Sequence, residues 1–435
     1  MNVVFFAIVA IAFLVSAGRQ LVWVAPSPDA VSPMNALTAS VAESAGNAVT
    51  LAIGLVGMMT LFLGLMKVVE AGGMLKILSK AMRPVMVRLF PDVPPDHPAM
   101  GAMILTMGAN AMGLTNAATP FGIRAIQALD TLNPRKGTAT NAMVLFLAIN
   151  TSAVTLLPTG VIATRIASGS TDPAGILPTT LFASALATVI GVLAAKLYQR
   201  WSPIVVDDDT AGDAAGPAEP SPSLAVDAAM AETTDEAYPV WASMTGFVLV
   251  GIGIVLAVIY GREVAPWIIP GLVILFLGFG MARGVRVYEV LVDGGREGFQ
   301  VAVRIIPYIV AILVAVGMFR ASGALEMLVG TVGPVTSLVG MPAEALPMAL
   351  LRPLSGQGAF GVMVAIIQDP AIGPDSYTGY LVSTMQGATD TTFYILAVYF
   401  GAVQVRRMRH ALAAGLSADV AGMAGAIIAC SYLYG

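Results

Sequence analysis

The sequence predicts an all-α integral membrane protein made of two related halves with opposite orientations in the bilayer. Of its 435 residues, 57% are hydrophobic and only 11% are charged, a balance too apolar for a protein whose whole surface meets water. Apolar runs of about 18 or more residues, enough to cross a bilayer as helix, recur along the chain. Two sequence patterns also recur in the same order. We therefore expect two inverted-topology repeats, each with a re-entrant helical hairpin and an interrupted transmembrane helix.

The first apolar run, residues 3–24, is expected to be a retained membrane helix. Arg19 and Gln20 interrupt it and no basic residue precedes it, so it lacks the charged start of a cleaved signal peptide. Eight further crossings follow from the apolar runs, which makes nine and puts the amino terminus inside and the carboxyl terminus in the periplasm. These crossings are residues 46–66, 139–160, 175–198, 240–260, 265–282, 298–318, 379–405 and 411–434.

A polar segment from Ser202 to Pro239 separates the halves. It carries nine acidic residues and no Lys or Arg, and it is rich in Ala, Pro and Ser. Such a composition buries too little apolar surface to offset the entropy of ordering. We expect residues 201–239 to be a disordered cytoplasmic linker between two membrane domains, residues 1–200 and 240–435. Outside the linker Lys and Arg outnumber the acids, which indicates cytoplasmic loops and not a nucleic-acid partner.

The internal repeat rests on two aligned pairs of segments. Residues 68–85 (VVEAGGMLKILSKAMRPV) align with residues 318–335 (MFRASGALEMLVGTVGPV) and place Gly73 on Gly323. Further along, Asn150-Thr151-Ser152 aligns with Asp390-Thr391-Thr392. Two separate matches in the same order indicate duplication of a whole unit and not a local coincidence.

Each half also contains a hydrophobic hairpin, at residues 98–129 and 342–368. The arms are too short to span a bilayer, and the middle is rich in Gly, Pro and small polar residues (GANAMGLTNAATPFG and RPLSGQGAFG). Non-helical backbone survives at that depth only when it is buried in protein or beside a watery cavity. We therefore expect each hairpin to enter and leave on one side of the membrane.

The distribution of basic residues predicts opposite sides for the two halves. An amphipathic segment before the first hairpin, Lys67 to Arg88, carries five bases, whereas its partner, Gly317 to Leu338, carries only Arg320. Cytoplasmic segments concentrate Lys and Arg, so the first should be cytoplasmic and the second periplasmic. Arg19 is the exception, because this scheme leaves it outside.

Asp390 is the only carboxylate that we place deep within a crossing helix. An ionised group inside the bilayer costs several kcal/mol by most scales, so it is a functional candidate. Three roles stay open for Asp390: a ligand of Na⁺, a carrier of a proton, or the partner of Arg352. Arg352 starts the break of the second hairpin and could equally bind an anionic substrate.

The uncharged candidates have two interpretations each. Asn150, Thr151 and Ser152 allow an unwound turn whose groups bind a cation or a solute hydroxyl, as do Thr391 and Thr392, but hydrogen bonding between helices explains the first three equally well. The amides and hydroxyls of the hairpins suit a neutral polar solute such as a nucleoside, or they cap short helices. These hairpin candidates are Asn110, Asn116, Thr119, Ser355 and Gln357.

Enzyme chemistry is not expected. The chain has no phosphate-binding loop, no nucleophilic triad pattern and no ligand-spaced group of Cys and His, and its single cysteine, Cys430, excludes an intramolecular disulfide. We expect no cofactor other than a coupling ion, Na⁺ or H⁺. The sequence does not decide the oligomeric state, so a homo-oligomer stays open.

Two segments carry a family resemblance. GLTNAATPFGIRAI (residues 113–126) resembles the bacterial spore maturation proteins A, and STMQGATDTTFYILAVYFGAVQVRRMRHAL (residues 383–412) resembles the spore maturation proteins B, here in one chain. That family carries the nucleoside-recognition or gate domain, named from the concentrative nucleoside transporters, in which two opposed hairpins and two interrupted helices enclose the substrate.

The resemblance implies that fold in a bacterial cytoplasmic membrane, but it does not supply a substrate. The leading interpretation is a secondary transporter or permease for a small polar solute, nucleoside-like or not, working by alternating access. The alternative is a membrane scaffold or accessory subunit that keeps the fold and transports nothing.

Overall fold

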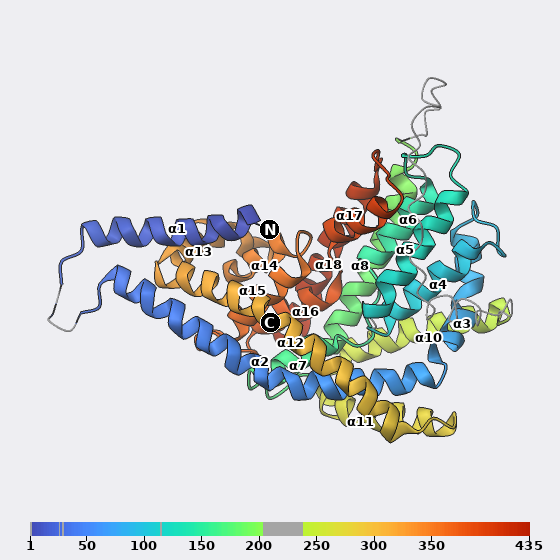
Figure 1. Cartoon of the computed structure of the whole chain (residues 1–435), viewed down its shortest axis with the longest axis horizontal. Helices are drawn as coiled ribbons and strands as arrows, with labels where there is room; N and C mark the ends of the chain where they lie inside the picture. The colour runs from blue at the N-terminus through green and yellow to red at the C-terminus, as the bar shows by residue number, and fades with distance from the viewer. Residues whose placement is uncertain (1, 26, 28–29, 114, 203–237) are drawn as a thin grey trace.

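The computed structural model describes the whole chain except residues 1, 26, 28–29, 114 and 203–237, and the described residues form helices joined by turns (Figure 1). One isolated β-bridge, between Thr138 and Arg407, joins two of these turns. Most of the linker expected at residues 201–239 lies outside the described residues. The all-helical class predicted from composition is confirmed.

Two long helices form the first of two antiparallel pairs. α2 (Pro33–Ala71) and α12 (Val287–Ala321) pack closely because glycines face the neighbouring helix: a Cβ on Gly298 would lie 2.5 Å from the Met59 carbonyl oxygen, and one on Gly317 would clash with the Ser44 hydroxyl. The 39 residues of α2 span about 58 Å, almost twice a bilayer core. The crossings predicted at 46–66 and 298–318 thus cover only part of each helix, toward its carboxyl end.

The second antiparallel pair lies in the middle of the molecule. α8 (Ile176–Tyr198) and α18 (Ala411–Tyr434) again meet through small residues: a Cβ on Gly191 would lie 3.1 Å from Ala418, and one on Gly425 would lie 3.0 Å from Ala183. The predicted boundaries, 175–198 and 411–434, differ from these by a residue at most. Each pair joins a helix of the first half to the helix in the same position of the second half.

A left-handed glycine follows each long helix. Gly73 (φ 83°) separates α2 from α3 (Met74–Leu89), and Gly323 (φ 84°) separates α12 from α13 (Ala324–Thr336). A residue with a Cβ rarely adopts this conformation, which explains why both halves have glycine at the turn.

Two helix pairs follow in chain order. The first helix pair is α4 (Pro98–Ala111) with α5 (Thr115–Thr131); the second is α14 (Leu346–Leu351) with α15 (Gly356–Ile367), preceded by the 3₁₀ turns η1 (Ser337–Val339) and η2 (Ala343–Ala345). Lys196 at the end of α8 donates to the Leu89 carbonyl (2.9 Å), close to the base of the first pair. Tyr377 donates to the Gly340 carbonyl (2.7 Å) at the base of the second and is bonded to Ser431 near the end of α18. The two bases therefore lie at opposite ends of the α8/α18 pair.

Both halves also contain a broken helix. α6 (Asn141–Thr151) and α7 (Thr159–Ala167) are separated by residues 152–158, and α16 (Tyr377–Ala388) and α17 (Thr392–Ala402) by residues 389–391. The crossing predicted at 139–160 covers α6, the break and the first two residues of α7.

One hydrophobic core joins the first helix pair to α6 and α17, and a second joins α15 to α16 and to the residues of α7. Each core thus contains a half-helix from the other repeat.

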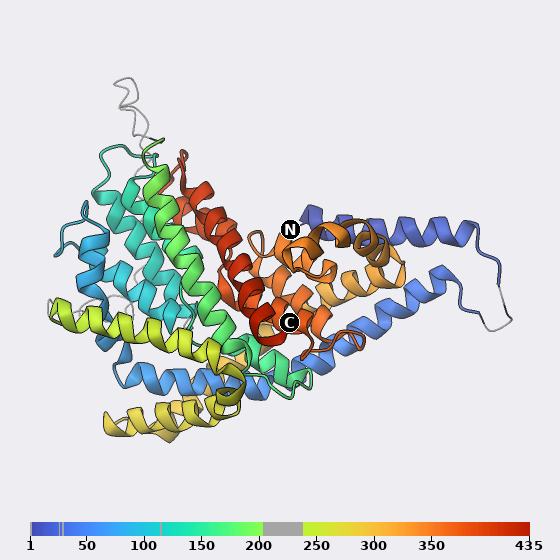
Figure 2. The same cartoon turned by 180° about the vertical axis from the view of Figure 1, so that it is seen from behind.

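The remaining helices lie at the periphery. α1 (Asn2–Leu21) packs beside α12, while α10 (Val240–Ile259) and α11 (Gly261–Ala282), yellow-green to yellow in Figure 2, flank the bundle with large apolar side chains such as Trp267 and Ile274 exposed. Four of the described helices are each long and apolar enough to cross a membrane alone, namely α2, α8, α12 and α18. The chain is a multi-pass membrane protein; the nine-crossing scheme stays a prediction.

Candidate functional site

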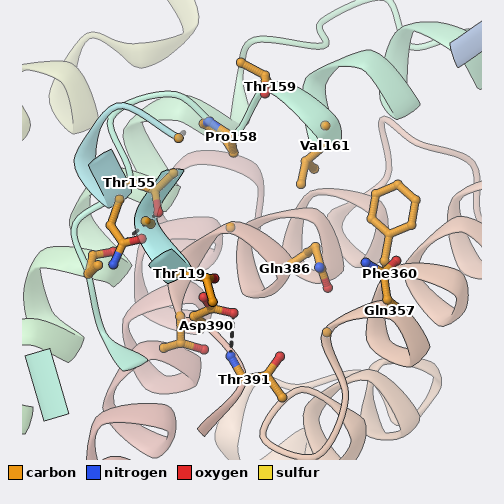
Figure 3. Close-up of a pocket in the computed structure, with 18 of the residues that line it drawn as sticks. Thr119, Thr155, Pro158, Thr159, Val161, Gln357, Phe360, Gln386, Asp390 and Thr391 are labelled. Carbon is orange, nitrogen blue, oxygen red and sulfur yellow. Dashed lines mark hydrogen bonds between the residues drawn. The ribbon is translucent and has the colours of Figure 1, made fainter. Parts of the chain in front are cut away.

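A cavity of about 1110 Å³ lies where the two helix breaks and the inner ends of the two helix pairs meet. Its walls come from both halves, and Figure 3 shows the polar side chains of both breaks around one space. The polar residues that line it include Asn110, Thr119, Asn150, Thr155, Thr159, Arg352, Ser355, Gln357, Gln386, Asp390 and Thr391. Apolar contacts come from Val161, Phe360 and Tyr399, among others. A roomy space with a few polar groups converging on it is typical of a small-molecule site.

The two breaks are bonded directly to each other. The backbone N–H of Asp390 donates to the Thr151 carbonyl at 2.7 Å. Broken helices leave backbone groups without their helical partners, and here one break satisfies the other. The two aligned segments, residues 150–152 and 390–392, therefore meet at one point.

The first helix pair is tied to the first break by an amide pair. Asn110, at the end of α4, donates to Oδ1 of Asn150 at 2.8 Å, and Nδ2 of Asn150 donates in turn to the Phe146 carbonyl at 2.9 Å. Asn110 is only partly buried, and both amides line the cavity. Asn150 therefore makes the hydrogen bond between helices that was one of its two interpretations, and it also lies in the cavity wall.

Arg352 holds the second break. The guanidinium is only 5% exposed and donates to the Thr389 carbonyl and, at 3.4 Å, to the Thr391 hydroxyl. Within the described part of the chain, no ion pair shorter than 4.0 Å joins Arg352 to Asp390. The structural ion pair considered from the sequence is therefore not formed, because the guanidinium is engaged with the backbone and hydroxyl on either side of Asp390.

Asp390 faces the cavity and is exposed there. Its Oδ1 accepts from the backbone N–H of Thr391 at 2.7 Å, the contact drawn in Figure 3, and this bond orients the carboxylate at the start of α17. A carboxylate at a helix amino terminus is stabilised by the helix dipole. At the helix breaks the cavity therefore presents the Asp390 carboxylate beside neutral amides and hydroxyls.

The structure divides the remaining predicted residues. Thr119, Ser355 and Gln357 line the cavity, and Ser355 also caps α15 by accepting from the Gly358 N–H at 3.0 Å. Three predicted residues do not line it, because their hydroxyls are bonded elsewhere: Thr151 and Ser152 donate to the Ala148 carbonyl at 2.9 and 2.7 Å, and Thr392 donates to Asp419 at 2.7 Å. The side chain of Asn116 lies outside the described residues.

Asp419 corrects one prediction. It lies in the middle of α18 and is 1% exposed, so Asp390 is not the only carboxylate deep within a crossing. The signal was available, since Asp419 interrupts the small-residue run GLSADVAGMAGA inside the predicted crossing at 411–434. Gln386, one turn before Asp390, was missed in the same way, although it lines the cavity.

Ion pairs lie on either side of the site. Lys67 of α2 lies 3.3 Å from Glu70 and 3.4 Å from Glu297 of α12, and all three line the cavity. At the far end of α7, the fully buried Arg165 lies 3.0 Å from Asp375 and also donates to the Pro374 carbonyl. The Lys67–Glu297 and Arg165–Asp375 pairs each connect the two halves of the chain.

Comparison with known proteins assigns the family. The profile of the Gate family, described as "Nucleoside recognition", matches residues 52–168 and 302–406, about half of the chain. The chain is 45% identical to Spore maturation protein B of Bacillus subtilis over 177 residues, which cover 40% of this chain and 98% of the relative. It is 43% identical to Spore maturation protein A of the same organism over 162 residues, 37% of this chain and 81% of the relative. No solved structure matches significantly. The chain therefore belongs to the nucleoside-recognition, or Gate, family of membrane proteins and is related to both spore maturation proteins.

Proposed function

We propose that this protein is a secondary transporter or permease that binds a small polar solute in the cavity between the two helix breaks. The observation that carries the proposal is the cavity itself: about 1110 Å³ of space, lined by amides, hydroxyls and charged groups, Asp390 among them, from both halves of the chain. The alternative, a scaffold that transports nothing, would need no polar space there. Non-helical backbone and polar side chains within a membrane are costly unless they border such a cavity.

The lining favours a nucleoside-like solute. Gln357 and Phe360 lie on one face of α15, so an amide and an aromatic ring are presented together, as Figure 3 shows. An aromatic face stacks on a planar base and an amide bonds to its edge. Asn110, Asn150 and Asp390 supply acceptors and donors that suit sugar hydroxyls. The family description, nucleoside recognition, is consistent with this class of solute.

Alternating access would use an inverted repeat of two domains, residues 1–200 and 240–435, joined by a cytoplasmic linker. Equivalent helices packed antiparallel support it, as in α2 with α12 and α8 with α18. The bases of the two helix pairs at opposite ends of the α8/α18 pair support two re-entrant hairpins that gate the cavity from opposite sides. In a bacterium the membrane would be the cytoplasmic one. Asp390 would supply the negative charge for a coupling Na⁺ or proton.

Ligand binding to the purified full-length protein tests the proposal. Thermal unfolding in detergent with and without uridine, adenosine, a free nucleobase, an amino acid or succinate should give a rise in Tm for one class, since a ligand that binds only the folded state stabilises it. Gln357→Ala should abolish that rise, and Thr331→Ala, on the exposed face of α13, should keep it.

Uptake of the same compound into proteoliposomes then separates transport from binding alone. The absence of a shift with every class, together with tight liposomes that take up none of these compounds, would contradict transport and favour the scaffold.

A further inference from the structure

Asp419 is a buried carboxylate with one oxygen left unbonded. Its Oδ2 accepts from the Thr392 hydroxyl at 2.7 Å, whereas Oδ1 is buried and has no hydrogen-bond partner within the described residues. The residue is 1% exposed in the middle of α18. An ionised carboxylate in such a place is costly unless a cation or a proton compensates it.

The position of Asp419 is built around the second break. Gly415 and Gly422 lie about one turn away on either side of it, and a Cβ on either would come within 2.6 Å of Thr392 or Thr389 respectively. The two glycines therefore let both ends of the break, the first residue within it and the first residue after it, pack onto α18. Asp419 lies between these two contacts: its Oδ2 accepts from the Thr392 hydroxyl, and the Thr389 side chain also interacts with the carboxylate.

Few charged groups face Asp419. Arg352 and Asp390 are those with an electrostatic effect on it. Of the helices packed against α18, α6 and α10 contain no titratable residue, α16 and α17 contain only tyrosines, and α8 adds Lys196 and Tyr198 at its far end. Lys196 is bonded to the Leu89 carbonyl and Tyr198 to Ser417. Arg352 is thus the nearby cation, and its guanidinium is already engaged with Thr389 and Thr391.

These observations favour a proton over a metal ion as the compensating charge. Within the described part of the chain, no three His, Cys, Asp or Glu side chains come together around Asp419 or elsewhere. A metal cation would also lie close to the positive guanidinium of Arg352. A proton needs only the free Oδ1.

We propose that Asp419 is a proton-binding site that controls the conformation of the break between α16 and α17. A hydronium ion gives its proton to Oδ1, which leaves a neutral carboxylic acid and a water molecule. The neutral acid still accepts from Thr392, and Arg352 stays on the break. When the proton leaves, the carboxylate competes with the Thr389 carbonyl and the Thr391 hydroxyl for Arg352, and the break loosens.

Proton binding here does not depend on the proposed solute, although its use in transport rests on the proposed function. The test therefore uses no solute. Infrared difference spectra of the full-length protein in nanodiscs between alkaline and acidic pH should show a protonated carboxyl band. The band should be lost in Asp419→Asn, retained in Asp390→Asn, and displaced in Asp419→Glu, which serves if the Asn variant does not fold. A band that is unchanged in both Asp419 variants overturns the site. A tenfold change in the proton concentration at the titration midpoint when Na⁺ replaces choline overturns it too, because it would show that Na⁺ competes for the carboxylate.

The link to the break has its own readout. Phe393→Trp places an indole in the cavity wall just after the break, whereas Tyr432→Trp places one on the exposed surface at the end of α18. The fluorescence of the first variant should change with pH and lose that change when Asp419→Asn is added, while the fluorescence of the second stays constant. A pH response of the Phe393→Trp variant that survives the addition of Asp419→Asn overturns control of the break, whatever the solute screen finds.

Discussion

The backbone N–H of Asp390 donates a 2.7 Å hydrogen bond to the carbonyl of Thr151, so the breaks of the two broken helices are joined at one point. Thr151 and Asp390 come from the two segments, residues 150–152 and 390–392, that align with each other in the repeat. The cavity is built around this contact, and the side chains of Asp390 and Thr391 on one side and Asn150 on the other open into it.

Asp390→Asn should leave folding intact and abolish coupled uptake. The amide oxygen can keep the bond to the Thr391 N–H, and no ion pair with Arg352 is lost within the described structure. The free energy of unfolding should therefore change by less than about 0.5 kcal/mol. Melting curves and proteoliposome uptake check both parts.

Arg352→Met, in contrast, should lower Tm, because it removes the donors that hold the Thr389 carbonyl and the Thr391 hydroxyl. The double variant Arg352→Met/Asp390→Asn should be no more stable than Arg352→Met alone. A destabilised Asp390→Asn that the double variant rescues would mean that Asp390 only balances Arg352 and has no role in coupling.

Asn110 and Asn150 should be energetically coupled. Each of Asn110→Ala and Asn150→Ala removes the same 2.8 Å bond, so the double variant should cost less than the sum of the two. A coupling energy of roughly 0.6 to 1 kcal/mol is expected for a bond between membrane helices. Unfolding in mixed micelles measures it, and strict additivity would show that the first helix pair and the first break are independent.

Gly298→Ala should destabilise the α2/α12 pair. The new methyl group would meet the Met59 carbonyl oxygen at 2.5 Å and the Thr60 Cα at 2.8 Å, and backbone atoms cannot move aside as a flexible side chain can. We expect a loss of about 1 to 3 kcal/mol. Gly271→Ala on α11 is the control, since no described atom outside the local helix backbone lies within 4 Å of its added Cβ, and stability should be unchanged or slightly higher. Equal melting temperatures of the two variants would contradict this packing.

Lys76→Cys and Leu338→Cys should be labelled from opposite sides of the membrane. Lys76 of α3 and Leu338, just after α13, are exposed residues that follow the two antiparallel long helices. The native Cys430 is fully buried and is replaced by Ala as background. A membrane-impermeant maleimide applied to intact cells should reach only Leu338→Cys. Labelling of both variants from outside the cell would contradict the opposite orientation of the two halves.

Asp375→Asn should destabilise the protein at neutral pH, because it leaves the buried Arg165 without its ionic partner. The expected loss is on the order of 2 to 3 kcal/mol, smaller than for a fully buried pair because Asp375 is partly exposed. Burial raises the pKa of Asp375, but hydrogen bonds from Ser170 and Thr171 and the Arg165 charge outweigh it and hold that pKa below its usual value. The carboxylate therefore stabilises the fold above the pKa of the unfolded chain, near 3.8, and loses this effect as the pH falls through the lower folded value. The difference in Tm from the native protein should stay unchanged from pH 7 to about 5 and narrow as the pH falls toward about 3. A difference that does not narrow at the lower pH would contradict the ionic role.

Much of the architecture follows from local pattern. Apolar runs too long for a soluble core define membrane helices wherever they occur, and the glycines at positions 73 and 323 end α2 and α12 because only glycine readily takes the left-handed conformation. The two breaks were foreseeable around Asn150 and Asp390, since Pro, Gly and hydroxyl residues interrupt a helix by chemistry that is visible in sequence. The ends of α8 and α18 were predicted within a residue, because each helix coincides with one apolar run.

The tertiary structure alone decided which of those polar groups does what. Asn150 faces the cavity and its neighbour Thr151 does not, because a helix turns by about 100° per residue and its rotation is set by packing against other helices. Arg352 bonds to the residues around Asp390 and not to Asp390 itself, and Asp419 is buried against the break. Neither arrangement is visible in local sequence, because each is a contact between different helices. The exchange of half-helices between the two cores has the same origin. Local pattern is enough to place the apolar helices and their breaks, whereas the side chains that meet at the breaks depend on close packing of one half against the other.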